Sequence, residues 1–142
     1  PKFLGAITWK DVRFQDHSWR TYPFREAHNL AGIRCSHYFP SGLTGRAQGG
    51  VHVAYNNAQK QGTSCLVGHG HHLDIKVRTF GSGRKIFSAS AGCCVHTRYK
   101  EPWCKDTRHL WDIGALILRG VKSGAPASYE WIYWDEVLAR TE

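Results

Sequence analysis

The chain has 142 residues, of which 42% are hydrophobic and 13% aromatic, and its 19 Lys and Arg against 11 Asp and Glu give a net charge of +8. This length suits one domain, and the apolar content excludes a wholly disordered chain. No apolar run is long enough to cross a membrane, and the N-terminus lacks the apolar core and cleavage site of a signal peptide. We therefore expect a single domain over residues 1–142, in the cytoplasm and away from membranes.

The five cysteines give no sign of a disulfide framework. Their number is odd, Cys93 and Cys94 are adjacent, and no C-x-x-C pair occurs, which also argues against a zinc ribbon. Cys35 and Cys65 suit the role of small buried hydrophobic residues on strands. This cysteine usage agrees with a cytoplasmic compartment.

Residues 1–30 have no clear hydrophobic period, so we expect loops there with a short strand around 18–22. Residues 29–39 alternate better and run into a Pro and a Gly, which predicts a strand that ends near His37. His37 would then lie at the carboxyl end of a strand, where open α/β sheets bind their ligands. A single histidine in such a place is more often structural, so it needs partners to make a site.

A glycine-rich loop that carries the basic Arg46 fills residues 43–50, and a helix is expected over residues 51–61, ended by Gly62. Apolar residues recur on one face of this helix at Val51, Ala54, Tyr55 and Ala58. A helix between two strands is the usual connection of a parallel pair, and it places both carboxyl ends at one edge of the sheet.

The second strand of that pair is expected at residues 64–67, and three histidines follow it within four positions. His69 and His71 are separated by one glycine, so both rings can face one point. Imidazole binds zinc, iron, nickel and manganese, but two imidazoles are too few to hold an ion. His37 would converge on them from the neighbouring strand, whereas His72 would point away.

The second half of the sequence is typical of antiparallel strands. Residues 72–80 and 84–91 alternate around a Gly-Ser-Gly hairpin signal. A polar loop over residues 95–109 separates them from two further apolar strands at 111–121 and 128–134.

Positive charge is concentrated between Lys76 and Arg108, where eight Lys or Arg accompany two acidic residues. A surface of this charge attracts phosphate, on nucleic acid or on a small ester. No recognition helix or RNA-binding motif accompanies it, so an ordinary solvated face is an equal alternative. Arg46 and Arg78 are the candidates for contacts with a phosphate ester.

Three segments stand out together: Cys35-Ser36-His37-Tyr38-Phe39-Pro40-Ser41-Gly42, then Gly68-His69-Gly70-His71 after an apolar strand, then Ala91-Gly92-Cys93 after a hairpin. In this order they resemble the C-terminal half of calcineurin-like metallophosphoesterases, particularly phage and bacterial members, over nearly the whole chain. The resemblance implies an α/β fold, mostly β with one or two short helices, as part of that family's four-layer sandwich. It also implies that His37 and His69 bind one divalent metal and His71 a second, about 3.5–4 Å away, in a centre that hydrolyses phosphomonoesters or phosphodiesters.

The N-terminal half of that family supplies the motifs D-x-H, G-D-x-x-D or -N, and G-N-H-D or -E, and none of them occurs here. The bridging carboxylate and several metal ligands would therefore be missing. We expect a chain that needs an N-terminal half for activity, from a separate chain or a homo-oligomer, in a bacterial or phage-infected cell. Two alternatives stay open: an inactive remnant that binds phosphate or nucleic acid through its basic face, and a structural interaction module with packed histidines.

Removing one half of such a sandwich would bare an apolar face that is normally buried. We expect that face to be formed by Ile113, Ala115, Ile117, Trp131 and Tyr133. The isolated chain should then be inactive and prone to self-association.

Overall fold

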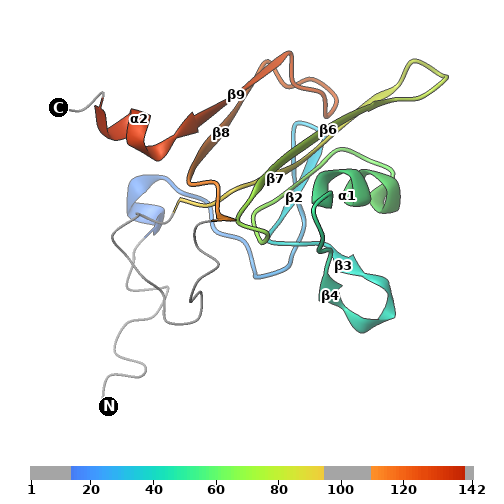
Figure 1. Cartoon of the computed structure of the whole chain (residues 1–142), viewed down its shortest axis with the longest axis horizontal. Coiled ribbons are helices and arrows are strands. Elements are labelled where there is room, and N and C mark those ends of the chain that lie inside the picture. Colours follow the sequence, from blue (N-terminus) through green and yellow to red (C-terminus); the bar gives the residue numbers. More distant parts are fainter. Residues whose placement is uncertain (1–13, 95–109, 140–142) are drawn as a thin grey trace.

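The structure, a computed structural model, describes residues 14–94 and 110–139 (Figure 1). These residues contain the strands β1 (His28–Leu30), β2 (Ile33–Ser36), β3 (Pro40–Ser41), β4 (Arg46–Ala47), β5 (Cys65–Val67), β6 (Leu73–Thr79), β7 (Lys85–Ala91), β8 (Gly114–Arg119) and β9 (Ser128–Tyr133). They also contain the helices α1 (Val53–Gln61) and α2 (Trp134–Ala139) and the 3₁₀ helices η1 (Phe14–His17) and η2 (Gly42–Thr44). The fold is therefore α/β and mostly strand with two short α helices, which confirms that part of the prediction. No helix in the described ranges is long and apolar enough to cross a membrane.

Five strands form the main sheet, in the order β1-β2-β5-β7-β6. The expected parallel pair of β2 and β5 is confirmed, with Ser36 opposite Val67 at their carboxyl ends. The expected β6–β7 hairpin is also confirmed. The second half is not an antiparallel sheet of its own, however, because β7 joins β5 as a third parallel strand, with Ser88 opposite Cys65.

Helix α1 connects β2 to β5 on one face of the sheet, as predicted, but it begins at Val53 rather than at residue 51. Val51 is 79% exposed and lies outside the helix, so the predicted apolar face is shifted. The buried residues of α1 are Val53, Ala54, Asn57 and Ala58. A shift of this kind is common at helix starts, where no single residue type marks the boundary unless a capping side chain is present.

The two ends of α1 are held by different groups. Gly62 ends the helix as predicted, with the left-handed φ of 60°, and its N–H donates to the carbonyl of Ala58. At the start, Asp74 Oδ2 on β6 accepts a hydrogen bond of 2.7 Å from the N–H of Ala54. Asp74 thus supplies the capping oxygen that helix N-termini require, from a strand of the sheet below.

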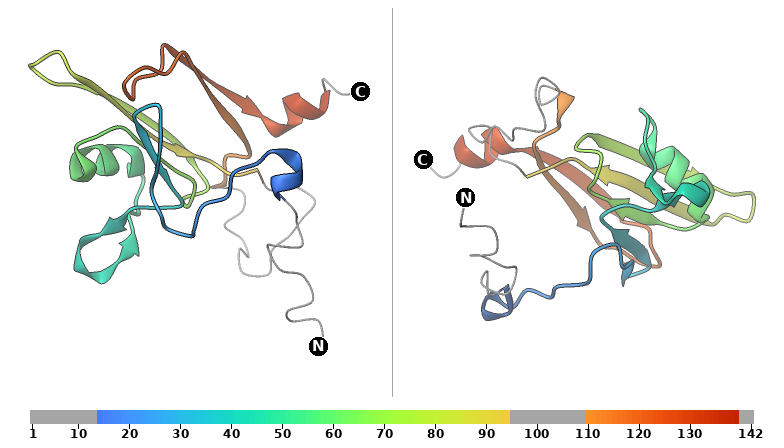
Figure 2. Two further views of the ribbon diagram at one scale, coloured as in Figure 1. Left: turned by 180° about the vertical axis from the view of Figure 1, so that it is seen from behind. Right: turned by 90° about the horizontal axis from the view of Figure 1, so that it is seen from below.

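The main sheet carries an apolar core on each face. The core under α1 is formed by Phe39, Val53, Cys65 and Val67. The core on the other face is formed by Ile33, Phe87 and Ala89, with Leu116 and Leu118 of the β8–β9 hairpin packed against them. The described part of the chain thus has a helix layer, a five-stranded sheet and a hairpin layer (Figure 1, Figure 2).

The N-terminal region differs from the prediction. No strand forms at residues 18–22, and the single strand expected over residues 29–39 is a tight hairpin of β1 and β2. Ala31 and Gly32 have φ values of 50° and 91°, the positive values that a two-residue hairpin turn requires. His37 nevertheless follows directly after β2, as predicted. The expected loop at 43–50 is partly structured, because β3 and β4 pair antiparallel.

The β8–β9 hairpin shows that the five residues expected to form one exposed apolar face do not share a face. Trp131 pairs with Leu116, which packs on the main sheet, so Trp131 and Tyr133 lie on the inner side of the hairpin. Ala115 and Ile117 alternate with Leu116 and lie on the outer side. The prediction was wrong because neighbouring strand residues point to opposite faces, and the pairing register decides which positions share one.

Candidate metal centre

The predicted site lies where β2 and β5 end side by side. The N–H groups of Gly68 and His69 both donate to the carbonyl of His37, at 3.2 and 3.1 Å. These two hydrogen bonds extend the β2–β5 pairing past the strand ends and tie the two histidine segments together. The sequence prediction that His37 and His69 converge at one edge of the sheet is therefore consistent with the backbone.

The side chains of His37 and His69 meet directly. His69 Nδ1 lies 3.0 Å from His37 Nε2, and the ring centroids are 4.9 Å apart with the planes at 80°. A tetrahedral zinc ion with Zn–N bonds of about 2.05 Å would separate two imidazole nitrogens by about 3.3 Å. An ion shared by these two nitrogens would thus require them to move apart by only a few tenths of an ångström.

His71 lies close to this pair but is oriented by other contacts. Its ring packs edge-on against Trp111, with centroids 4.3 Å apart, and its backbone φ is 55°. Its carbonyl accepts a hydrogen bond from the N–H of Asp112 at 2.9 Å. Among the described residues, no group of three or more His, Cys, Asp or Glu is arranged to hold a metal ion. The structure thus brings the side chains of His37 and His69 into contact, whereas His71 lies beside them and packs on Trp111.

Burial and repulsion by neighbouring imidazoles disfavour protonation of His37 and His71. The pKa of His37 is lowered, mainly by burial and then by the charge of His69. The pKa of His71 is lowered by burial and then by the charges of His69, His37 and His72. Neutral imidazole is the form that binds metal, so both rings are prepared for that role near neutral pH.

His72, which was predicted to point away from the other histidines, is oriented by local contacts of its own. Its ring is half-buried, Nδ1 lies 2.8 Å from the carbonyl of Gly70, and Nε2 is buried without a hydrogen-bond partner among the described residues. An Nδ1–H donated to a carbonyl leaves the Nε2 lone pair free, which is the usual arrangement in a metal-binding histidine. A Cβ at Gly70 would lie 2.8 Å from Cε1 of the ring, so a larger residue there would displace the His72 side chain.

Aromatic and basic side chains that the sequence did not single out surround the histidine pair. The Phe24 ring centroid lies 5.2 Å from that of His37, and the Tyr38 centroid lies 5.1 Å from that of His69. The guanidinium of Arg25 lies 5.2 Å from the centre of the Tyr38 ring. No sequence period marks Phe24 or Arg25, and only the position of Tyr38 next to His37 could have suggested a role.

The two predicted phosphate-binding arginines are not brought to the histidines by the described contacts. Arg78 lies five residues along β6 from Leu73, about 17 Å at the usual rise of a strand. There it donates to Gln59 Oε1 on α1. Arg46 is exposed on β4, and its side chain has no hydrogen bond or ion pair within the described ranges.

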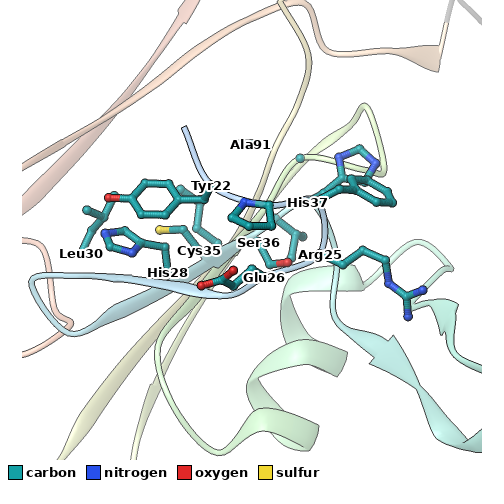
Figure 3. A pocket seen from close by; sticks show the side chains of 14 residues that line it. Tyr22, Arg25, Glu26, His28, Leu30, Cys35, Ser36, His37 and Ala91 are labelled. Atoms are coloured by element: carbon teal, nitrogen blue, oxygen red, sulfur yellow. The ribbon is translucent and has the colours of Figure 1, made fainter. Parts of the chain in front are cut away.

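A cavity of about 480 Å³ opens beside His37, between the segment at 22–28 and the ends of β2 and β5. Figure 3 shows Tyr22, His28, Leu30 and Cys35 at one end of it and His37 at the other. This size is in the range of pockets that hold small molecules.

No protein-family model matches the chain, and neither a curated protein nor a solved structure matches it.

Proposed function

We propose that the chain is the C-terminal portion of a metal-dependent phosphoesterase similar to the calcineurin-like metallophosphoesterases. One observation carries this proposal: His69 Nδ1 lies 3.0 Å from His37 Nε2 at the ends of two adjacent parallel strands. Parallel strands with a helical crossover place their functional residues at this edge. The order of the three sequence motifs that carry the resemblance agrees with this position.

In this proposal His37 and His69 hold one divalent ion, of zinc, manganese, iron or nickel, and His71 helps to hold a second. Such ions lower the pKa of bound water and neutralise charge on the phosphate. The chain's own contribution is to keep the His37 imidazole neutral through burial, and to hold the two histidine segments together through the hydrogen bonds to the His37 carbonyl. Arg25, held over Tyr38, adds positive charge near the place where a phosphate would bind.

The remaining ligands are proposed to come from an N-terminal half, on a separate chain or on a second copy of this one. The layers support this view, because β8 and β9 form a sheet of only two strands in the described ranges, stacked on the main sheet. A two-stranded sheet is marginal by itself, and further strands would complete the second sheet of a four-layer sandwich. The isolated chain is then expected to bind metal weakly and to hydrolyse no ester at an enzymatic rate.

The test combines metal binding with hydrolysis. Calorimetric titration with zinc or manganese should show binding that is lost in His69→Ala and retained in His52→Ala. His52 is a suitable control because it is exposed and makes no side-chain capping bond at the start of α1. Hydrolysis of bis-p-nitrophenyl phosphate with manganese should appear only when a complementary N-terminal chain is added. Equal metal affinity in the two variants, or full turnover by the monomeric chain alone, would contradict the proposal.

A second candidate function is phosphate or nucleic-acid binding through a basic surface at the C-terminal end of α1. Arg34 donates to Gln61, Arg84 donates to the carbonyl of Gly62, and Arg78 donates to Gln59. None of the three pairs with a carboxylate in the described residues, so their charges remain available to an anion. The guanidinium groups of Arg78 and Arg84 each lie 4.6 Å from the centre of the Phe80 ring, which fixes them in place.

Salt dependence distinguishes this candidate. Binding of a fluorescent single-stranded oligonucleotide should weaken steeply between low and physiological salt, because neutralised phosphates release counterions. Arg84→Gln should reduce that slope by about one unit. If binding does not change with salt, the basic surface does not bind nucleic acid. The chain is then either the proposed phosphoesterase portion or a purely structural module.

A further inference from the structure

The cavity beside His37 has the shape and chemistry of a site for a flat, polar-edged ring. Its wall contains a stacked pair, Tyr22 and His28, with ring centroids 3.8 Å apart and planes at 23°. Its floor is apolar and comes from the face of the main sheet, through Leu30, Leu66 and Ala91. Tyr22 is 42% exposed, so the stacked pair still offers surface on which another ring could stack.

The wall of the cavity also carries an acidic side chain. Glu26 lines the cavity, and its carboxylate forms no hydrogen bond or ion pair with the residues that the structure describes. A carboxylate only accepts hydrogen bonds, and its two oxygens match a pair of adjacent N–H donors on one edge of a ligand. Figure 3 shows Glu26 between the Tyr22–His28 end of the cavity and Ser36, away from Arg25, which points outward.

The opposite end of the cavity reaches the proposed metal centre. His37 and Gly68 both line it, and His69 Nδ1 lies 3.0 Å from His37 Nε2. A ligand seated against Tyr22 and Glu26 would therefore direct its other end to the histidines. A divalent ion held by these two imidazoles would suit a phosphate at that end.

We propose that this cavity binds the base of a nucleotide, a planar heterocycle that stacks on Tyr22 and donates two N–H groups to Glu26, with its phosphate at His37 and His69. Guanine has such a pair of donors on one edge, whereas adenine, cytosine and uracil do not. The proposal rests on the proposed function for the phosphate end and names its substrate class, a phosphate ester of a nucleoside. The base end depends on no metal.

The experiment measures base recognition apart from metal and turnover. Binding of guanosine monophosphate and of ribose phosphate is followed by saturation-transfer NMR and equilibrium dialysis, with EDTA present throughout. The nucleotide should bind more tightly than ribose phosphate. Tyr22→Ala should weaken nucleotide binding about fivefold or more, because stacking of a base on an aromatic ring is worth about 1–3 kcal/mol. Tyr55→Ala is the matched control, since Tyr55 is 44% exposed on α1, across the sheet from the cavity.

Glu26→Gln tests the selectivity for donors. It should remove most of the preference for guanosine over adenosine monophosphate while leaving the stacking contribution in place. Glu26 and Tyr22 are exposed, so unchanged thermal unfolding of each variant confirms that the fold is retained. Equal binding of the nucleotide and ribose phosphate, or equal effects of Tyr22→Ala and Tyr55→Ala, would overturn the inference. If Tyr22→Ala weakens nucleotide binding but His69→Ala leaves metal binding unchanged, the base-binding cavity is supported and the phosphoesterase proposal is rejected.

Discussion

Replacing Gly92 by Ala should loosen the contact between the main sheet and the β8–β9 hairpin. A Cβ at this position would lie 2.5 Å from the carbonyl oxygen of Asp112 and 2.5 Å from Cη2 of Trp131. The N–H of Asp112 donates to the carbonyl of His71, and the N–H of Gly92 donates to the carbonyl of His72. Making room for the Cβ would move the Asp112 backbone or the Trp131 ring, and this movement would also shift the loop that carries the histidines.

The size of the effect follows from two separate costs. Gly92 has a φ of +60°, and an L residue in this region costs about 1–2 kcal/mol. The clash with backbone and with a packed ring adds about 1–3 kcal/mol, as overpacking does elsewhere. The expected loss of about 2–5 kcal/mol is a large part of the about 5–15 kcal/mol by which folded proteins are stable. Gly62→Ala isolates the first cost, because Gly62 also has a φ of +60° but nothing within 4 Å of its Cβ position.

The free energy of unfolding would be measured by urea titration, followed by tryptophan fluorescence and circular dichroism. Gly92→Ala should lose clearly more stability than Gly62→Ala, and it should also bind zinc more weakly. If the two variants lose the same stability, the hairpin does not pack over Gly92 and the proposed link to the histidine loop is wrong.

Three further outcomes can be measured by the same unfolding assay. The folded-state pKa values of His37 and His71 lie below the ordinary 6.5, so the unfolded chain binds more protons than the folded chain. The stability of the metal-free protein should therefore fall as the pH drops through 6.5, and it should keep falling until the pH is below the lowered pKa values. A His71→Asn variant should show a shallower fall, and an unchanged slope would exclude this cause. Asp74→Ala should cost about 0.5–2 kcal/mol by removing the cap from the N–H of Ala54, and no loss would show that water replaces it. Phe87→Ala should cost about 3–5 kcal/mol because the side chain is 1% exposed in the core under the hairpin, and a loss below 1 kcal/mol would place it outside that core.

Local patterns determined the parts of this fold that depend on neighbouring residues. The Gly-Ser-Gly signal predicted the β6–β7 hairpin, and Gly62 predicted the end of α1. Both signals work because backbone conformation at a turn or helix end is set by a few adjacent residues. The β2–β5 parallel pair followed from the length of the connection, and with it the meeting of His37 and His69.

Tertiary packing alone decided where most side chains of the candidate centre point. His71 packs against Trp111, which is forty residues away in sequence, and no local pattern could reveal that contact. Arg78 was expected near a phosphate, but the direction of β6 carries it to Gln59 at the far end of α1.

The segment at residues 22–28 was an irregular lead-in by sequence, yet its packing builds the wall of the cavity beside His37. Packing also decided the two faces of the β8–β9 hairpin, where Trp131 lies on the inner side and Ile117 on the outer side. A strand's pattern of residues states which positions share a face, but the face that becomes buried depends on the partner that arrives there. Sequence by itself therefore determined the strand ends that carry the histidines, and the packing of distant segments decided what surrounds them.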